Sequence, residues 1–241
     1  MKIAILSDIH ANLEALTAVL QSIARRGCDR VICLGDIVGY GPDPNACVVM
    51  VQERADWVVQ GNHDRAAIGL LDLADFNDHA RQALTWTAEE LSQDAKEFLR
   101  GLPPVCQVEG SLCVHACPYE PLAWDYILAV SQAFLQFRHF DEQVCFIGHS
   151  HVPVSFRWDG NRLSRSSQWP MQMDREARYI INVGSVGQPR DGNPQAAFGI
   201  WQPKKWLFEL CRVAYDVRAV QEKMRRLPLP VYLIERIAYG H

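Results

Sequence analysis

Five short segments of this 241-residue chain carry side chains of the kinds that bind divalent metal ions. Carboxylates, imidazoles and amide oxygens are the ligands that hard and borderline divalent metals take in proteins. The segments are Asp8-Ile9-His10, Gly35-Asp36, Gly61-Asn62-His63-Asp64, His115 and Gly148-His149-Ser150-His151. Five of the eight histidines fall in them, so the set indicates a metal site more strongly than any single segment does.

If these residues bound a pair of metal ions, they could catalyse displacement at phosphorus. Two divalent ions about 3.5–4 Å apart form a clamp for in-line displacement at phosphorus. Such a site needs one carboxylate that reaches both ions, and Asp36 is the candidate for that bridge. The terminal ligands would be of mixed type: Asp8, His10, Asn62, His115, His149 and His151.

The same reaction needs a proton donor beside the leaving oxygen. His63 suits this role because the unperturbed pKa of imidazole is about 6.5. Asp64 follows it directly and is predicted to orient the His63 ring. In the expected reaction a metal-bound hydroxide attacks phosphorus while His63 protonates the departing alkoxide.

Taken alone, each segment has an ordinary explanation. Asn62 suits a helix cap, and a single histidine such as His115 is more often a core residue than a ligand. His149 and His151 suit a turn. The occurrence of all five segments in one chain favours the metal site over these alternatives.

The segments stand where strands end. Four of them directly follow apolar runs that are typical of buried strands, and His115 ends a fifth run; the runs are 2–7, 31–34, 57–59, 111–114 and 144–147. Polar residues at the carboxyl ends of strands in an α/β sheet converge on one crevice. Helical spacing over 12–26 and a helix opened by Pro44 complete a β-α-β-α-β order, which predicts parallel strands with right-handed crossovers.

The remaining chain is predicted to alternate between helices and strands within one domain, 1–241. Residues 65–102 read as a wholly helical insert that forms either one wall of the pocket or a packing helix pair. Further strands are expected at 105–108, 111–115, 143–147, 152–158, 161–165, 178–183, 197–202 and 206–213, with a hairpin signal at 158–162 and helices at 130–138 and 216–226. The last residues, 227–241, contain Pro228 and Pro230 and are predicted to form an extended tail.

Composition narrows the class of protein. Nearly half of the residues are apolar (49%), which allows a sizeable core. The formal net charge of -4 gives no broad basic surface, so nucleic acid is not expected as a partner. No stretch approaches the roughly 18 apolar residues of a membrane span, and the apolar run after Lys2 meets Asp8 too early for a secretory signal. We therefore expect a cytoplasmic protein without a membrane partner.

Cysteines and late aromatic residues add two expectations. The eight cysteines include no Cys-x-x-Cys pair and are predicted to be free, mostly buried thiols. The aromatic residues late in the chain suit a homo-oligomer surface and a packed second sheet equally well; they are Trp201, Trp206, Tyr215, Tyr232 and Tyr239.

In the order of its five segments the chain resembles the calcineurin-like metallophosphoesterase superfamily. The pattern of that family is Asp-x-His, Gly-Asp, Gly-Asn-His-Asp/Glu, a lone His and Gly-His-x-His, and the resemblance covers roughly residues 1–200. Segments 36–42 and 182–190 resemble the small bacterial and archaeal phosphodiesterase branch. The resemblance implies a four-layer α/β (α+β) fold, with two mixed β-sheets packed face to face, helices on their outer sides and the metal site at the strand ends.

The resemblance also implies a division of ligands. One ion would take Asp8, His10, Asp36 and His151, and the other would take Asp36, Asn62, His115 and His149. Members of the family use manganese, iron, nickel, cobalt or zinc, and the sequence does not choose among them.

The function implied is that of a dinuclear metal-dependent phosphodiesterase acting on a small phosphorylated or nucleotide-like substrate. A phosphomonoesterase and a dinucleoside polyphosphate hydrolase are alternatives of the same class. Gln60 stands where Ser/Thr protein phosphatases carry a phosphate-binding arginine, which disfavours that branch. Relatives that serve as non-catalytic interaction scaffolds lose metal ligands or the catalytic histidine, whereas this chain keeps all seven ligand positions and His63.

Three residues are candidates for contact with the substrate. Arg190 follows a strand whose end should face the metals, and an arginine can clamp a phosphate oxygen through two hydrogen bonds. Arg65 follows His63-Asp64, and Tyr40 follows the bridging carboxylate closely enough to stack on a ring. An ordinary surface arginine is an equally good explanation of Arg190 and of Arg65.

Overall fold

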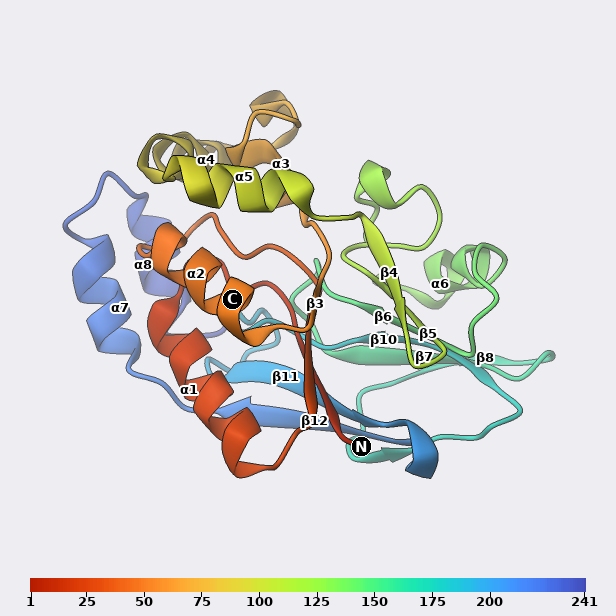
Figure 1. The fold of residues 1–241 in the computed structure, drawn as a ribbon. Coiled ribbons are helices and arrows are strands. Elements are labelled where there is room, and N and C mark those ends of the chain that lie inside the picture. The colour runs from red at the N-terminus through yellow and green to blue at the C-terminus, as the bar shows by residue number, and fades with distance from the viewer.

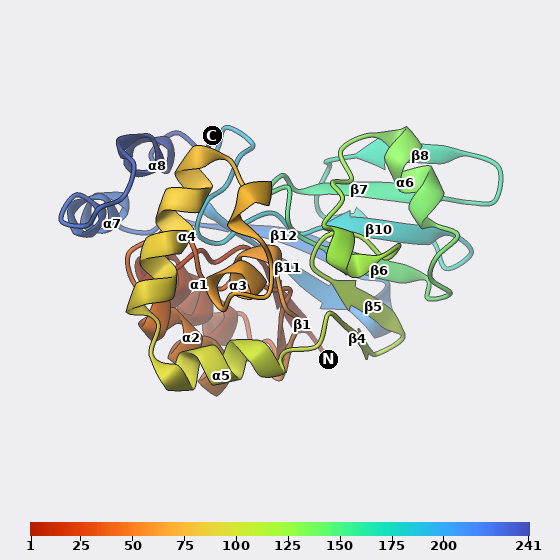
Figure 2. The same cartoon turned by 90° about the horizontal axis from the view of Figure 1, so that it is seen from above.

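The apolar runs expected as strands form the centre of the molecule. The computed structural model describes residues 1–241 and contains two mixed, six-stranded β-sheets. The sheets lie face to face (Figures 1 and 2). The helices α1 (Leu13–Arg25), α2 (Pro44–Arg54) and α7 (Val217–Met224) lie outside one sheet, and α6 (Val130–Gln136) lies outside the other. The predicted four-layer arrangement is confirmed.

The first sheet has the order β3-β2-β1-β11-β12-β9. Its strands are β3 (Trp57–Val58), β2 (Arg30–Cys33), β1 (Ile3–Leu6), β11 (Ala196–Gln202), β12 (Leu207–Val213) and β9 (Met171–Gln172). The strands β1, β2 and β3 are parallel, as the β-α-β-α-β order predicts, and β11 joins β1 in antiparallel register with Ile3 opposite Trp201. Strand β9 has only two residues, too few for a recognisable pattern, and was not predicted.

The second sheet has the order β4-β5-β6-β10-β7-β8. Its strands are β4 (Val105–Val108), β5 (Ser111–Val114), β6 (Val144–Ile147), β10 (Arg178–Asn182), β7 (Val154–Trp158) and β8 (Leu163–Ser166). The three central strands β5, β6 and β10 are parallel, so their carboxyl ends lie at one edge. The predicted hairpin at 158–162 joins β7 to β8, where Asp159 Oδ1 accepts hydrogen bonds from the backbone N–H groups of Asn161 and Arg162.

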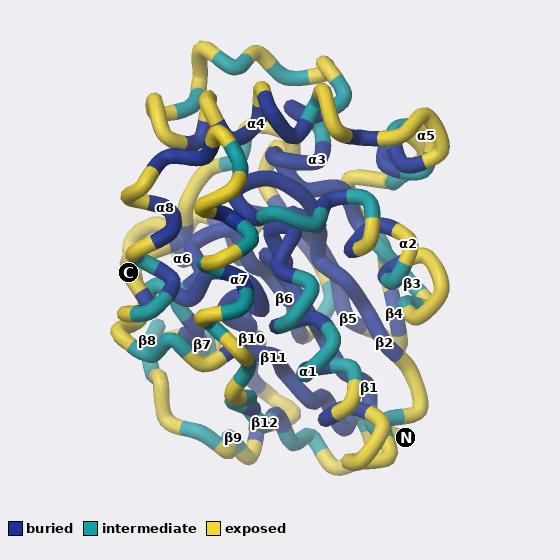
Figure 3. The backbone as a smooth tube through the Cα atoms, turned by 90° about the vertical axis from the view of Figure 1, so that its left-hand side faces the viewer, coloured by how far each residue is buried: buried dark blue, intermediate teal, exposed yellow.

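Alternation of side chains along each strand explains the layers. Ile3 and Ile5 of β1 enter the core between the two sheets, whereas Ala4 and Leu6 face the helices on the outer side. Successive side chains of a strand point to opposite faces of the sheet, and every residue of β1 is buried. Figure 3 shows the strands as the buried centre and the loops as the exposed surface.

Eight α-helices surround the sheets. They are α1 (Leu13–Arg25), α2 (Pro44–Arg54), α3 (Asn62–Ala67), α4 (Asp78–Glu90), α5 (Gln93–Gly101), α6 (Val130–Gln136), α7 (Val217–Met224) and α8 (Val231–Arg236). Polar side chains cap several of them: Asn12 accepts from Ala15 N at the start of α1, and Asn77 accepts from Ala80 N at the start of α4. None of the helices is long and apolar enough to cross a membrane.

The segment 65–100 is not wholly helical, and that prediction was wrong. Gly69 adopts a φ of 76° after α3, and residues 68–77 form a loop with one 3₁₀ turn, Leu73–Asp75. The side chains of Asp72 and Asn77 hydrogen-bond to backbone N–H groups in this loop and its flanks, which favours a turn and a fresh helix start over one continuous helix. The loop brings Phe76 against His63.

The extended conformation predicted for 227–241 was also wrong. Leu229, Leu233 and Ile237 recur at helical spacing and are buried against α4 and α7. Pro228 and Pro230 precede α8 instead of interrupting it, a position at which proline is well tolerated. The C-terminal segment is therefore part of the packed structure.

The aromatic residues divide between core and surface. Trp201 and Trp206 pack against the core between the sheets, while Tyr232 and Tyr239 are exposed. All eight cysteines are free and six are buried, as expected.

Candidate metal centre

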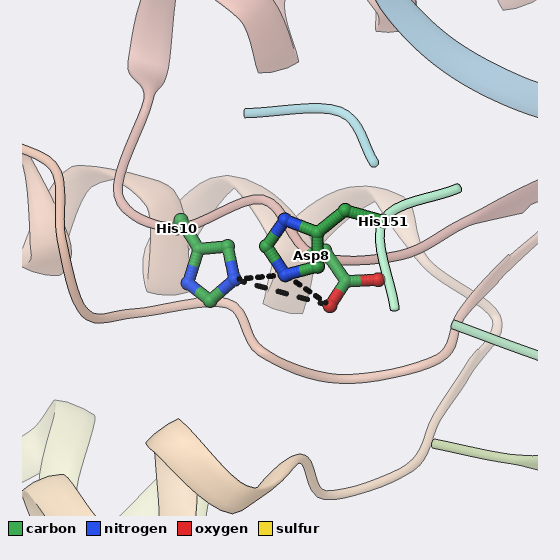
Figure 4. Close-up of side chains that lie close together, drawn as sticks. All are labelled: Asp8, His10 and His151. Atoms are coloured by element: carbon green, nitrogen blue, oxygen red, sulfur yellow. Dashed lines mark hydrogen bonds and ion pairs between the residues drawn. The ribbon is translucent and has the colours of Figure 1, made fainter. Parts of the chain in front are cut away.

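The structure brings together Asp8, His10 and His151 at the carboxyl ends of β1 and β6 (Figure 4). His151 Nε2 lies 3.2 Å from Asp8 Oδ1 and 3.1 Å from His10 Nε2. All three side chains are buried. The two sheets are joined here by backbone hydrogen bonds from Val186 and Gly187 to the carbonyls of Ser7 and Asp8.

A second group lies next to the first and consists of Asp36, His115 and His149. His115 Nε2 is 3.3 Å from Asp36 Oδ2, and the same oxygen is 3.7 Å from His10 Nε2 of the first group. Asp36 Oδ2 is thus positioned between the two groups. The two groups contain the residues that the family resemblance divides between two ions, apart from Asn62, whose buried Oδ1 has no hydrogen-bond partner. A third group overlaps both and joins His10 and Asp36 to His63.

Hydrogen bonds at Nδ1 determine the tautomer of three histidine side chains. His10, His115 and His151 each place Nδ1 against a backbone carbonyl, at 3.1 Å, 2.7 Å and 2.6 Å respectively. A carbonyl can only accept, so Nδ1 carries the proton and, in the neutral ring, Nε2 keeps its lone pair. This is the tautomer and orientation in which histidine binds metals.

The site fits a metal ion because its acceptors face one another. In neutral rings His10 Nε2 and His151 Nε2 are both unprotonated, so their 3.1 Å separation is not a hydrogen bond and is repulsive without a cation. The buried Nε2 atoms of His115 and His149 and the Oδ1 atom of Asn62 have no hydrogen-bond partner. Buried polar atoms are normally satisfied, so this concentration of unsatisfied atoms calls for a ligand.

Burial keeps most of these imidazoles neutral. It lowers the pKa of His149 to about 3 and that of His63 to about 4, although the carboxylate of Asp36 opposes the shift. Burial also lowers the pKa values of His10 and His151. Neutral imidazole is the form that coordinates a metal.

His115 and the two carboxylates behave differently. Burial alone would lower the pKa of His115, but Asp36 and Asp8 raise it to about 9. Burial alone would raise the pKa values of Asp8 and Asp36, but the imidazoles around them hold both pKa values far below the usual range. The two carboxylates therefore attract positive charge. Without a metal ion that charge is a proton on His115, and binding of a metal ion would release it.

Backbone strain is concentrated at the same place. Asp8, His10, Asp36, His149 and His151 all have positive φ, between 50° and 66°. This left-handed conformation is uncommon for residues other than glycine, and such strain gathers at functional sites.

Two glycines of the motifs permit close approach. A Cβ atom at Gly61 would overlap the carboxylate of Asp36, and one at Gly148 would overlap Ser7 and Asp8. Gly61 and Gly148 therefore let the ligand-bearing loops come together, which is the physical reason for glycine at these positions.

His63 and Asp64 start helix α3 beside this cluster, and here one prediction was wrong. The backbone N–H of His63 donates to Asp36 Oδ1 at 2.8 Å, and its buried Nδ1 has no hydrogen-bond partner. Asp64 does not bond to that ring. Its Oδ1 accepts from Ile37 N and Val38 N and its Oδ2 from Gly61 N, so Asp64 ties together the loops that carry Asp36 and Asn62.

One cavity adjoins the ligand cluster, and a second cavity shares part of its lining. The inner cavity, of about 450 Å³, is lined by Asn62, His63 and His149. The outer cavity, of about 620 Å³, is lined by Arg190. Tyr40 lines both cavities, and its ring centroid is 4.4 Å from that of His63.

The three predicted substrate contacts differ in position. Tyr40 and Arg190 face the cavities, with the Arg190 guanidinium 5.8 Å from the Tyr40 ring centroid. Arg65, within α3, lines neither cavity, and its Nη1 donates to Gln60 Oε1 at 3.2 Å.

Sequence reasoning missed several residues that line the cavities. Tyr126 stacks on His149 with ring centroids 4.1 Å apart, and Trp124 lies beside His115 with an unpartnered, buried Nε1. Arg236 reaches the outer cavity from α8. These residues belong to no motif and come from loops or from the segment predicted to be extended, so no local signal marked them.

Comparison with known proteins identifies the family of this chain. Residues 1–204 match the model of the calcineurin-like phosphoesterase superfamily domain. The chain is 38% identical over 244 residues to "Uncharacterized protein MJ0912" of Methanocaldococcus jannaschii, covering 99% of this chain and 98% of that protein.

Comparison with solved structures finds the same fold in other proteins. A crystal structure of a metallophosphoesterase from Sphaerobacter thermophilus superposes with a TM-score of 0.90 at 41% identity, covering 100% of this chain and 99% of that one. The hypothetical protein PH1004 from Pyrococcus horikoshii OT3 superposes with a TM-score of 0.80 at 20% identity, covering 100% and 98%, and shares the fold.

Proposed function

Since the chain belongs to the calcineurin-like phosphoesterase superfamily, we propose that it is a dinuclear metal-dependent phosphodiesterase acting on a small phosphorylated or nucleotide-like substrate. The observation that carries the proposal is the convergence of the unprotonated nitrogens of His10 and His151 with the carboxylate oxygens of Asp8 and Asp36 at the strand ends. These atoms repel one another unless cations lie among them.

Two ions would be divided between the two groups of ligands. Asp8, His10 and His151 would hold one, and His115, His149 and Asn62 the other, with Asp36 shared between them. The position of Asp36 Oδ2 between His115 and His10 supports the shared role. In such a site divalent cations supply Lewis-acid polarisation of the phosphoryl group and activation of water.

His63 is proposed as the proton donor to the leaving group. Its ring lies in the inner cavity next to the ligands, and its Nδ1 is free of other hydrogen bonds. The negative charge of a bound phosphate favours the protonated imidazole, against the effect of burial. Arg190 and Tyr40 would hold the non-reacting oxygens and the substituent of the phosphate.

Preference for a diester is supported by the two cavities. A phosphate at the ligand cluster would border the inner cavity, which shares the lining residues Tyr40, Asn77 and Tyr126 with the outer cavity. A monoester would fill only one of them. A phosphate with two substituents would fill both.

The test is hydrolysis by metal-free protein to which manganese, nickel or zinc is added back. Bis-p-nitrophenyl phosphate and p-nitrophenyl phosphate are compared at equal concentrations. Metal-dependent turnover that favours the diester supports the proposal. Faster turnover of the monoester would make the protein a phosphomonoesterase, and failure to hydrolyse either compound with any metal would contradict the proposal.

A further inference from the structure

Two arginines from distant parts of the chain meet in the outer cavity. Arg190 follows β10 and Arg236 ends α8, and both side chains line the cavity of about 620 Å³. Because both guanidinium groups line one cavity, their charges repel each other; burial and the charge of Arg190 accordingly lower the pKa of Arg236. Placing two like charges together in a partly buried site is unfavourable, and an anion between them would offset the cost.

Neither arginine forms an ion pair with an aspartate or glutamate side chain. Arg190 donates through Nε and Nη2 to the neutral Gln188 Oε1, at 3.3 Å and 2.7 Å. Arg236 donates through Nε to a main-chain oxygen of His241, the last residue of the sequence, and lies over the ring of Tyr232; its Nη1 and Nη2 atoms have no other partner. Asp78 lines the same cavity but is paired with Arg81. The remaining N–H groups of both guanidinium groups are thus available to a ligand.

The pair is continuous with the metal centre. The backbone N–H of Arg190 donates to the carbonyl of His151, and the carbonyl of Gln188 accepts from His151 Nδ1. Arg190 therefore stands between the ligand cluster and Arg236, on the path of a substrate that enters the outer cavity.

We infer that Arg190 and Arg236 form a subsite for a second phosphate group, bonded directly to the phosphate that lies at the metal centre. The inference rests on the proposed function and narrows it to substrates with a diphosphate group, in which the scissile phosphate still carries two substituents. The C-terminal helix α8 is on this reading a specificity element, since it supplies Arg236. Tyr126, which is 46% exposed and lines both cavities, offers a surface for a ring attached to such a group.

The subsite is tested by binding, independently of turnover. Dissociation constants for AMP and for α,β-methylene-ADP, whose bridging carbon prevents hydrolysis between its phosphates, are measured by calorimetry at one fixed manganese concentration. A hydrogen bond to a charged group contributes enough to change affinity by about 10- to 100-fold. We expect the wild type to bind α,β-methylene-ADP at least about tenfold more tightly than AMP.

Three variants make the comparison specific. Arg236→Met keeps an unbranched side chain without the charge and should abolish most of the preference, while Arg236→Lys keeps the charge and should restore part of it. Arg226→Met, at an exposed arginine after α7, is the matched control and should keep the wild-type ratio. If Arg236→Met does not fold, as judged by its melting temperature, Arg190→Met tests the other half of the pair.

The outcomes separate the two proposals. Equal affinity of the wild type for the two nucleotides, or an unchanged ratio in Arg236→Met, would overturn the subsite. A ratio that collapses in Arg236→Met supports the subsite even if the wild type hydrolyses neither nitrophenyl ester, a result that would count against the proposed function alone.

Discussion

Replacing Asp64 with asparagine distinguishes a structural role from a catalytic one. The carboxylate of Asp64 accepts hydrogen bonds from Ile37 N at 2.8 Å, Val38 N at 3.2 Å and Gly61 N at 3.0 Å. An asparagine amide has only one acceptor oxygen. Its NH₂ group must therefore face at least one of these backbone donors, which loses a bond and leaves a buried donor unpaired.

The cost follows from those contacts. Burial and the charge of Asp36 raise the pKa of Asp64 to about 7, so the comparison is made above that pH, where the carboxylate is ionised. Loss of one hydrogen bond to a charged acceptor then costs about 1.5–3 kcal/mol, and the buried unpaired donor adds about 1–3 kcal/mol. We expect Asp64→Asn to lose about 3 kcal/mol or more of unfolding free energy, which is about 6–12 °C in melting temperature for a chain of this size. Because Asp64 joins the loops of Asp36 and Asn62, manganese affinity should fall by about 10- to 100-fold.

The assay compares melting temperature, metal content and kcat at saturating manganese. Asp141→Asn, at an exposed aspartate, is the control and should change stability by no more than about 0.5 kcal/mol. The metal-saturated Asp64→Asn protein is expected to keep kcat within about threefold of the wild-type value, since Asp64 does not touch the His63 ring. A loss of about 100-fold or more in kcat, the scale of general acid–base catalysis, with unchanged stability and metal content would refute this reasoning and restore the sequence-based role of Asp64.

Three further outcomes are expected. His63→Ala should lower kcat by about two to four orders of magnitude without changing metal content measured by mass spectrometry, whereas His139→Ala, at an exposed histidine, should leave kcat unchanged. Gly148→Ala should reduce bound metal and the melting temperature together, because its Cβ would overlap Ser7 and Asp8; full metal occupancy in this variant would show that the loop can yield. Removing metal with a chelator should lower the melting temperature, and manganese at about 100 times its dissociation constant should restore about 2.7 kcal/mol, as scanning calorimetry at several manganese concentrations can check; a melting temperature that does not depend on manganese would contradict binding to the folded state.

The two sheets were predicted through the family resemblance that the motifs carry, and the gathering of the motif residues was predicted from the strand pattern. Asp8, Asp36 and His149 each follow an apolar run closely, and the carboxyl ends of strands meet at one edge. The positions of these residues along the chain therefore carried much of the geometry.

Other features depend on contacts between distant segments. The Nδ1 partners of His10, His115 and His151 lie 28, 81 and 37 residues away in the chain, so their tautomers could not be predicted. Tyr126 and Arg236 belong to no motif and become part of the site only through packing.

Two of the wrong predictions, for residues 227–241 and for Asp64, can be explained. The prolines of 227–241 were given more weight than the helical spacing of Leu229, Leu233 and Ile237, which places α8 against α4 and α7. The contact between Asp64 and His63 was inferred from adjacency, whereas neighbouring residues at a helix start point in different directions and Asp64 turns back to the backbone of Gly61.

The most direct test of the metal centre is a crystal structure of the manganese-loaded protein with anomalous diffraction data. We expect two anomalous peaks about 3.5–4 Å apart. One should lie beside Asp8, His10 and His151, and the other beside His115 and His149, with Asp36 between them. A single peak, or peaks away from these residues, would contradict the dinuclear site.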